Sequence, residues 1–379
     1  MKNPRFTILA AFILLALAIP LANARSLADN RGNENSKNTP GAVYIMTNDS
    51  TGNQVIRYDR ANDGSLTFSG KFSTGGLGAT GLTGSNQGGI VLSNEGKTLL
   101  VVNAGSNDIS IFQIQGNLLS LTDKSSSNGI MPISLTIHNQ LVYVLNSGGA
   151  NGKGNIAGYT LDKEGELSPI TGSTQPLSGT TAPAQISFNP QGTILAVTEK
   201  STSLIDTYTV NTHGVASAPT THTSSGSTPF GFAFNNRGAL IVSEAAGGPS
   251  GTSAVSSYSV STSGDLTTAS ASVPDNQQAA CWVVVTGNGK YAYTTNAHSG
   301  SISSYTIDKN GEIHLLQSIA ANTGAGDIDM ALTRNSGYLY VSIISSHSIQ
   351  GYKVHDDGSL SWVTTITGVP AGADGLAAD

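Results

Sequence analysis

Tyr291 to Leu316, YAYTTNAHSGSISSYTIDKNGEIHLL, is the stretch that decides the fold, because it holds three short runs of alternating apolar and polar residues. Alternation with a period of two predicts strands that are buried on one side. The second run is followed by Asn310-Gly311, and an Asn-Gly pair between two such runs predicts a tight hairpin. The stretch therefore predicts three consecutive antiparallel strands.

The same pattern recurs along almost the whole chain. Successive copies lie about 50 residues apart, a spacing typical of repeat architectures. Most copies continue into a second strand, a Gly turn and a third strand, and six are preceded by a further strand. Four antiparallel strands repeated seven times predict an all-β, seven-bladed β-propeller. The opening strands of the seven copies end at Asn48, Asn103, Asn146, Glu199, Glu244, Asn296 and Ile343.

The first repeat lacks the strand that precedes the other six. The C-terminal segment from Gly372 to Asp379 resembles Asp327 to Leu332, which begins the last repeat. We therefore expect the C-terminal segment to complete blade 1 as its inner strand and to close the ring. Closure removes the open sheet edges that favour aggregation. A sandwich or a solenoid would not explain why the missing strand reappears at the other end.

The N-terminus has the pattern of an export signal. Lys2 and Arg5 precede an apolar run from Phe6 to Leu21, and Ala22-Asn23-Ala24 supplies a cleavage pattern. An uncleaved anchor is the alternative, but the apolar run is shorter than the roughly 20 residues of a membrane span. We expect cleavage before Arg25 and a secreted or periplasmic protein with no membrane span in its mature form.

Three segments follow from these patterns. Residues 1–24 form the predicted signal peptide. Residues 25–40 are polar and lack periodicity, which predicts a disordered leader. Residues 41–379 form the predicted propeller.

Composition narrows the function classes. Only 11% of the residues are charged, the net charge is −6, and no basic patch is present, which argues against nucleic-acid binding. Cys281 is the only cysteine, so an internal disulfide is excluded. It lies in an apolar strand, where we expect it to be buried. We expect a monomer.

Polar residues gather where the strands of a propeller meet the central channel. We expect the ends of the second strands and the starts of the inner strands to form a ring around one channel mouth. Asn at a strand end also caps turns through its own side chain, so a structural role stays open for the Asn residues. No metal-ligand spacing is present, and we expect no metal or other cofactor. The ring comprises Asn48, Asn103, Asn146, Glu199, Glu244, Asn296, Gln185, Gln277, Gln278, Asp327, Asp329 and Asp374, with His298 and His347 from the loops.

Residues 42–379 resemble the seven-bladed lactonase family, which includes bacterial 6-phosphogluconolactonases and fungal carboxymuconate cyclases. The resemblance rests on the blade pattern and on Pro183 to Gly192, PAQISFNPQG, followed by Val197-Thr198-Glu199. Family enzymes typically carry Pro-Arg-His at the start of the first of these strands and Asn-Glu at the end of the next. Here Glu199 matches the Glu, whereas Ala184 and Gln185 replace the Arg and the His.

The next blade departs from the family pattern too. Gly231 and Ala233 stand closest to positions where the family typically carries a Glu and a His. Lactone opening needs a base that activates water, and a cation that holds a phosphate or carboxylate. Of the family's usual set, Glu199 remains, with Lys200 beside it. The activity of the chain, a lactone hydrolase or cyclase if it is an enzyme, is therefore left open.

Two functions follow from the resemblance and its departures. In the first, Glu199 is the general base, and other residues of the ring bind a small lactone, sugar acid or carbohydrate. In the second, a non-catalytic extracellular or cell-surface propeller binds a protein or a polysaccharide at the same face. Tyr44 to Asn48 and Tyr293 to Asn296 favour the second, because they resemble the Tyr-Val-Thr-Asn repeats of secreted and surface-layer propellers. The candidate ligand-binding residues are Gln185, Asn146, Glu244, Lys200, Asn296, His298, Asp329 and Asp374.

Overall fold

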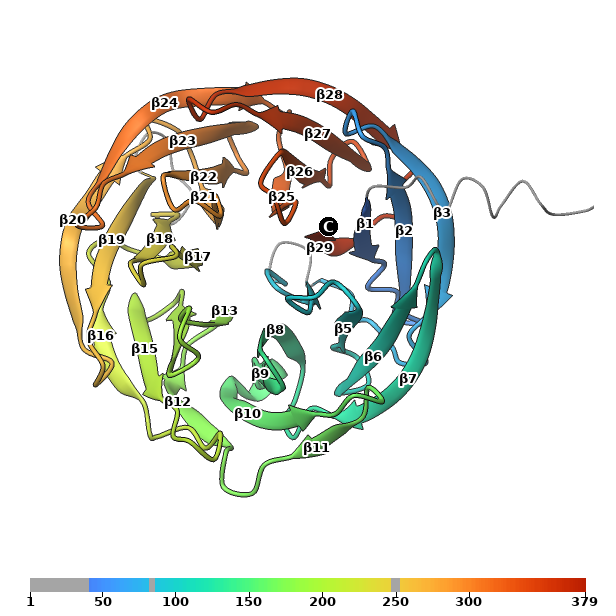
Figure 1. The fold of residues 1–379 in the computed structure, drawn as a ribbon. Coiled ribbons are helices and arrows are strands. Elements are labelled where there is room, and N and C mark those ends of the chain that lie inside the picture. Colours follow the sequence, from blue (N-terminus) through green and yellow to red (C-terminus); the bar gives the residue numbers. More distant parts are fainter. Residues whose placement is uncertain (1–40, 82–85, 247–252) are drawn as a thin grey trace, which may run out of the picture. The chain divides into compact units, whose positions relative to one another are not determined.

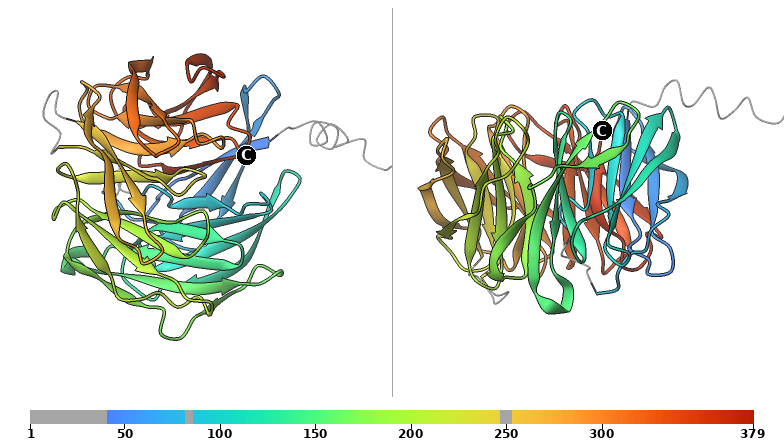
Figure 2. Two further views of the ribbon diagram at one scale, coloured as in Figure 1. Left: turned by 60° about the vertical axis from the view of Figure 1, so that its left-hand side comes forward. Right: turned by 90° about the horizontal axis from the view of Figure 1, so that it is seen from below.

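The computed structural model describes residues 41–81, 86–246 and 253–379, and these residues form seven antiparallel sheets that stand in a ring (Figure 1). Figure 2 shows the strands of the ring running between its two faces. The predicted signal peptide and leader, residues 1–40, lie outside the described residues. In the part of the chain that the structure describes, no helix is long and apolar enough to cross a membrane.

Each blade is built from consecutive strands, apart from the first. Blades 1 to 3 consist of β29 (Asp374–Ala378), β1 (Gly41–Met46), β2 (Gln54–Arg60) and β3 (Leu66–Ser73); β4 (Ile90–Leu92), β5 (Thr98–Asn103), β6 (Asp108–Gln115) and β7 (Leu118–Ser126); and β8 (Pro132–His138), β9 (Leu141–Asn146), β10 (Lys153–Leu161), β11 (Leu167–Pro169) and β12 (Gln175–Thr180).

The remaining four blades follow in chain order. Blades 4 and 5 consist of β13 (Pro183–Phe188), β14 (Ile194–Glu199), β15 (Leu204–Thr209) and β16 (Thr220–Thr223); and β17 (Pro229–Phe234), β18 (Leu240–Glu244), β19 (Ala254–Val260) and β20 (Leu266–Pro274). Blades 6 and 7 consist of β21 (Ala280–Val285), β22 (Tyr291–Asn296), β23 (Ser301–Ile307) and β24 (Ile313–Asn322); and β25 (Asp327–Leu332), β26 (Tyr338–Ile343), β27 (Ser348–Val354) and β28 (Leu360–Thr367). The predicted seven-bladed architecture is confirmed.

Blade 3 has five strands where the repeat pattern predicts four. Its outer strand is divided, because β11 and β12 both pair with β10. Pro169 ends β11, and proline has no amide hydrogen with which to continue a ladder. The Ser173 hydroxyl then accepts a hydrogen bond from the Gly158 amide at 3.0 Å, in place of a strand partner. A single proline and a serine therefore divide the strand.

The C-terminal strand closes the ring as predicted. β29 pairs with β1 in antiparallel register, with Val43 opposite Ala378 and Ile45 opposite Leu376. The Asp379 amide extends the ladder by donating to the Ala42 carbonyl at 2.9 Å. Val43, Ile45 and Leu376 are buried in one apolar cluster between the first and last blades. Figure 1 shows β29, in red, beside β1, in blue.

The predicted hairpin between β23 and β24 is present, with a longer loop than a two-residue turn. Residues 308–312 connect the strands, and the Gly311 amide donates to the Asp308 carbonyl at 3.2 Å. Gly311 has a φ of 86°, which an L side chain rarely adopts. The Asp308 carboxylate also accepts the amides of Asn310 and Glu312, each at 2.8 Å. The Asp308 side chain and Gly311 together set the loop length.

The turn before the outer strand binds each blade to the preceding blade. In every blade, a carbonyl in the turn between the last two strands of the four-strand core accepts a hydrogen bond from a side chain of the preceding blade. We call these seven contacts the turn latches. Their lengths are 2.6–3.0 Å, and their donor–acceptor pairs are Arg57–Gly116, Thr122–Gly165, Tyr143–Gly214, Thr207–Gly264, Arg237–Asp308, Tyr293–Gly358 and Tyr340–Gly64.

The turn latch across the ring closure is testable by Tyr340→Phe. The Tyr340 hydroxyl is the buried donor to the Gly64 carbonyl, at 2.7 Å. Its removal leaves that carbonyl without its partner, so we expect the free energy of unfolding to fall by about 1–3 kcal/mol. Denaturant unfolding followed by circular dichroism measures the loss.

Tyr338→Phe is the matched control on the same strand. The Tyr338 hydroxyl donates to the Asn62 carbonyl of the same turn at 2.8 Å, but in an exposed position. Water replaces that bond, so we expect a loss of less than about 0.5 kcal/mol. Equal losses in the two variants would contradict the assignment of the turn latch.

Candidate functional site

The strand-end residues of the predicted ring are buried at the junctions between strands and blades. Asn146 donates to the Ser127 carbonyl at 3.0 Å, and Asn296 donates to the hydroxyls of Ser301 and Ser303 at 3.1 and 2.8 Å. Asn103 makes the corresponding bonds to Asp108 and Ser110 in blade 2. These contacts hold the strand ends to neighbouring strands and loops.

Glu199 is fully buried and forms a pair with Asp206. Val197 lies opposite Asp206 in the ladder of β14 and β15, so residues 199 and 206 share one face of the sheet. The hydroxyl of Ser178, from blade 3, donates to Glu199 Oε2 at 2.5 Å, and the Ser178 amide donates to both carboxylates at 3.1 Å. Burial, with the neighbouring Glu199 carboxylate, raises the pKa of Asp206 to about 7. This carboxyl pair therefore joins blades 3 and 4.

Glu244 occupies the equivalent place in blade 5. It accepts hydrogen bonds from the hydroxyls of Ser256 and Ser272 at 2.5 and 2.7 Å, and from the Gly226 amide at 2.8 Å. It is buried, like Glu199. Both glutamates are thus satisfied by hydroxyl and amide donors at blade junctions.

A cavity of about 530 Å³ occupies part of the central channel. Its walls come from six inner strands, β4, β13, β17, β21, β25 and β29. In the last five, the first two residues of the strand do not line it, so the cavity lies towards the C-terminal ends of the inner strands. The strand-end residues of the predicted ring are not among the described residues that line it.

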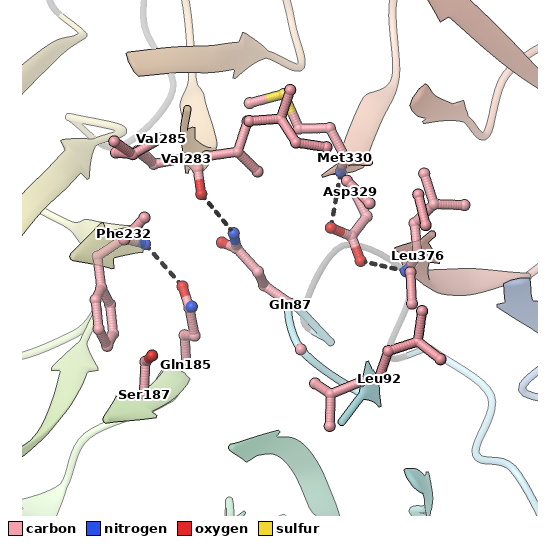
Figure 3. A pocket seen from close by; sticks show the side chains of 18 of the residues that line it. Gln87, Leu92, Gln185, Ser187, Phe232, Val283, Val285, Asp329, Met330 and Leu376 are labelled. Atoms are coloured by element: carbon pink, nitrogen blue, oxygen red, sulfur yellow. Dashed lines mark hydrogen bonds between the residues drawn. The ribbon is translucent and has the colours of Figure 1, made fainter. Parts of the chain in front are cut away.

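The seventh inner strand, β8, is covered by the segment Asn86–Gly89. The Leu135 amide of β8 donates to the Gly88 carbonyl at 2.7 Å, and the Gly89 amide closes a turn onto the Asn86 carbonyl at 2.7 Å. This turn points Gln87 into the channel, where its Nε2 donates to the Val283 carbonyl of β21 at 3.2 Å (Figure 3). Gln87 therefore links blade 2 to blade 6 across the cavity.

Two predicted site residues, Gln185 and Asp329, line this cavity. Gln185 accepts the Phe232 amide through Oε1 at 2.7 Å. Asp329 accepts the Met330 amide through Oδ1 at 2.8 Å and the Leu376 amide of β29 through Oδ2 at 2.7 Å (Figure 3). Gln185 and Asp329 thus lie on different sides of one space, in β13 and β25.

Asp329 belongs to a second buried carboxyl pair. Its side chain is 1% exposed, and its neighbour Asp374, at the start of β29, is fully buried. Burial and the Asp374 carboxylate raise the pKa of Asp329 well above its usual value. The repulsion between the two carboxylates disfavours their double ionisation.

The other predicted residues lie elsewhere. The Lys200 ammonium lies 4.6 Å from the centre of the Phe230 ring, and burial lowers the pKa of Lys200. His298 and His347 are exposed. The side chain of Asp327 lies outside the described residues. Among the side chains that the structure describes, no group of three or more His, Cys, Asp or Glu residues is close enough to hold a metal ion.

Sequence reasoning missed Gln87. Its only local signal in the sequence is the polar pair Asn86-Gln87, followed by Gly88-Gly89 directly before an inner strand. Two glycines in that place allow a turn to approach the channel closely.

The family comparison agrees with the resemblance drawn from the sequence. The family described as lactonase, 7-bladed beta-propeller, matches residues 37–175 and 244–330, together more than half of the chain. The chain belongs to the lactonase family of seven-bladed β-propellers. The interval between the two matched segments contains β13 and β17, the strands of Gln185 and Gly231.

Solved structures show the same fold at low sequence identity. A putative 6-phosphogluconolactonase from Bacteroides fragilis has a TM-score of 0.67 and 20% identity, with 89% of this chain and 98% of that chain covered. A putative 6-phosphogluconolactonase from Bacteroides uniformis has a TM-score of 0.67 and 19% identity, with coverage of 89% and 99%. The periplasmic gluconolactonase of Pseudomonas aeruginosa has a TM-score of 0.66 and 14% identity, with coverage of 88% and 98%. No curated protein matches the chain.

The carboxyl pair at the ring closure predicts a pH-dependent stability. An unfolded Asp has a pKa of about 3.9, and the folded pKa of Asp329 is raised, so between these values the folded state binds more protons. The stabilisation is therefore fully present below the unfolded pKa and is lost as the pH rises through the folded pKa. Asp374→Asn removes the like charge. We expect this variant to gain stability relative to the wild type between pH 5 and pH 8, by on the order of 1 kcal/mol.

Unfolding in denaturant at pH 5 and pH 8 measures this gain. Asp356→Asn is the control, because Asp356 is exposed in a turn, and we expect its difference from the wild type to be the same at both pH values. If the free energies of unfolding of Asp374→Asn and of the wild type changed equally between pH 5 and pH 8, the carboxyl pair would not be the cause of the pH dependence.

Proposed function

We propose that the protein hydrolyses a small lactone in its central channel, with Asp329 as the acid–base group. One observation carries the proposal: among the described residues that line the cavity, Asp329 is the only titratable side chain, and a second carboxyl lies beside it. Perturbed carboxyl pairs in concave sites are typical of acid–base catalysis. The names of the structural relatives, which include gluconolactonases, favour the same reaction class.

Lactone hydrolysis adds water across the ring C–O bond. A carboxylate takes a proton from the attacking water, and a carboxylic acid gives a proton to the departing ring oxygen. A pair of carboxyls that holds one proton supplies both roles in turn. In this proposal Asp329 contacts the reacting atoms, and Asp374 acts through Asp329 by raising its pKa, which favours the proton-donating form.

A second candidate function is ligand binding without turnover. Both oxygens of Asp329 already accept main-chain hydrogen bonds, and the described cavity lining contains no Lys, Arg or His. In that case the carboxyl pair only closes the ring, and the channel holds a small ligand. Turnover separates the two candidates.

The test compares Asp329→Asn with Glu199→Gln on glucono-δ-lactone and a panel of alkyl lactones. We expect Asp329→Asn to lower kcat by about 100-fold or more, the usual contribution of a general acid–base residue. Glu199 does not line the cavity, so Glu199→Gln is expected to affect stability and not the reaction. We expect its kcat to stay within about threefold of the wild type. Folding of both variants is checked by thermal unfolding.

Three results decide the outcome. Loss of activity in folded Glu199→Gln, with Asp329→Asn active, would assign the reaction to the Glu199–Asp206 pair. Loss in Asp329→Asn alone supports the proposal. No hydrolysis of any lactone by the wild type would leave the binding function as the better account.

We also propose that the protein is exported, on the strength of the sequence of residues 1–24. Expression in a bacterial host with fractionation, followed by mass spectrometry of the intact protein, measures this. We expect the exported form to begin at Arg25. A protein that begins at Met1 and stays in the cytosol would exclude export.

A further inference from the structure

Four inner strands begin with the same irregularity. In blades 4 to 7 the inner strand advances three residues while the next strand advances two, as between Pro183 and Ile186 in blade 4. Such a β-bulge changes the direction of the side chains at the extra residue, and bulges are common beside active sites. The residues at the equivalent bulge position of the four blades are Gln185, Gly231, Trp282 and Asp329.

Gln185 and Asp329 make the same contact from this position. Gln185 Oε1 accepts the Phe232 amide, and Asp329 Oδ2 accepts the Leu376 amide, each at 2.7 Å. Each of these amides belongs to the inner strand of the following blade, directly after the irregularity of that strand. The two side chains are therefore fixed in the same way in blades 4 and 7, and both line the cavity (Figure 3).

The other two bulge positions present no polar group to the cavity. Gly231 has no side chain, and a Cβ atom there would overlap Gln87 Oε1. Trp282 is fully buried, with its ring centre 5.1 Å from that of Phe230. Blades 4 and 7 therefore supply the polar bulge residues of the channel.

Gln185 offers an uncommitted donor. The contact with Phe232 sets the orientation of the Gln185 amide, because Nε2 in that place would face another donor. Nε2 makes no hydrogen bond to a described residue, but unlike Gln87 Oε1 it is not sealed from the cavity. The other amide and hydroxyl side chains of the described lining are engaged, because Gln87 Nε2 and the Ser187 hydroxyl each donate to a main-chain carbonyl at 3.2 Å.

Hydrolysis of a lactone places negative charge on the carbonyl oxygen. When water adds to the carbonyl carbon, a C–O bond forms, the π electrons move to the carbonyl oxygen, and Asp329 takes the water proton. The carbonyl then re-forms, the ring C–O bond breaks, and the ring oxygen leaves with the proton from Asp329, which gives a hydroxy acid. The described lining holds no Lys, Arg or His, so a neutral donor has to stabilise the oxyanion.

We infer that Gln185 Nε2 binds the carbonyl oxygen of the lactone and stabilises this oxyanion, an inference that rests on the proposed function. Asp329 and Gln185 then act on one carbonyl group from different sides of the channel. A donor whose orientation is fixed before the reaction needs no rearrangement as the charge develops. Removal of one such donor typically lowers kcat by about 100- to 1,000-fold.

Gln185→Glu tests the donor, because it keeps an oxygen for the Phe232 amide and replaces the donor nitrogen with a second oxygen. The substrate is glucono-δ-lactone, or the alkyl lactone that the wild type hydrolyses fastest. We expect kcat to fall about 100-fold or more, with KM within about threefold, because the oxyanion forms only during the reaction. Gln115→Glu adds the same charge at an exposed position of β6, so we expect it to change neither value.

Gln185→Met separates the loss of the donor from the effect of an added charge. Its side chain has a similar length and no donor, so we expect the same fall in kcat. Thermal unfolding checks that both variants are folded. A kcat of Gln185→Met within about threefold of the wild type, or a rise in KM alone, would overturn the inference, because a group that only binds the substrate changes KM.

Infrared spectroscopy detects the hydrogen bond itself. The probe is the same lactone labelled with ¹³C at the carbonyl, bound to Asp329→Asn, in which we expect slow turnover. A hydrogen bond lowers the stretching frequency of a carbonyl group. We therefore expect a higher frequency in the double variant Asp329→Asn/Gln185→Met than in Asp329→Asn, and equal frequencies would contradict the role of Gln185.

The two proposals fail in different ways. Loss of activity in Asp329→Asn alone overturns this inference and leaves the proposed function intact. Loss in both Gln185 variants, with Asp329→Asn active, overturns the acid–base assignment and supports Gln185 as the donor. If the wild type hydrolyses no lactone, the proposed function fails, and the infrared comparison of the wild type with Gln185→Met decides whether Gln185 binds the carbonyl oxygen. A protein that binds no lactone overturns both.

Discussion

The ladder between β1 and β29 is the constraint on which the rest of the structure depends. It joins the first and last strands of the propeller and leaves blades 1 and 7 with a shared apolar interface. It also brings the Leu376 amide to Asp329 and buries Asp374 beside it. The carboxyl pair in the channel wall therefore exists only in the closed ring. Ring closure and the candidate chemistry therefore depend on one strand pairing, because that pairing brings Asp374 beside Asp329.

The fold was predictable because its signals are local and repeated. Alternation of apolar and polar residues indicates each strand. A single copy of the pattern could be assigned wrongly, but seven copies support the same assignment. Ring closure followed from a strand missing at one end and present at the other. The divided outer strand of blade 3 was not predictable, because it depends on the Ser173 hydroxyl meeting the Gly158 amide on a neighbouring strand. The turn latches were not predictable either, because the sequence around a Tyr, Thr or Arg donor does not indicate which carbonyl of the next blade accepts its hydrogen bond.

The candidate site was predictable only in part. Gln185 and Asp329 were found because they are polar residues near the starts of strands that the repeat pattern places along the channel. The position of Glu199 at a strand end identified its strand but not the side of the blade that its carboxylate faces, which depends on Ser178 of the preceding blade. Gln87 was missed because it lies in an irregular segment, and its contacts with Val283 and Gly231 join residues distant in sequence.

The geometry of the β1–β29 ladder determines how it responds to a pulling force. Val43 lies opposite Ala378, and the Asp379 amide bonds the Ala42 carbonyl, so the first and last described residues emerge at the same end of an antiparallel pair. A force applied between residues 41 and 379 would open the hydrogen bonds one after another, as in a zip, instead of shearing them together. Loaded in this way, the ladder resists less force than it would if its hydrogen bonds were sheared together. The turn latch from Tyr340 to Gly64 and the apolar cluster between blades 1 and 7 oppose its opening.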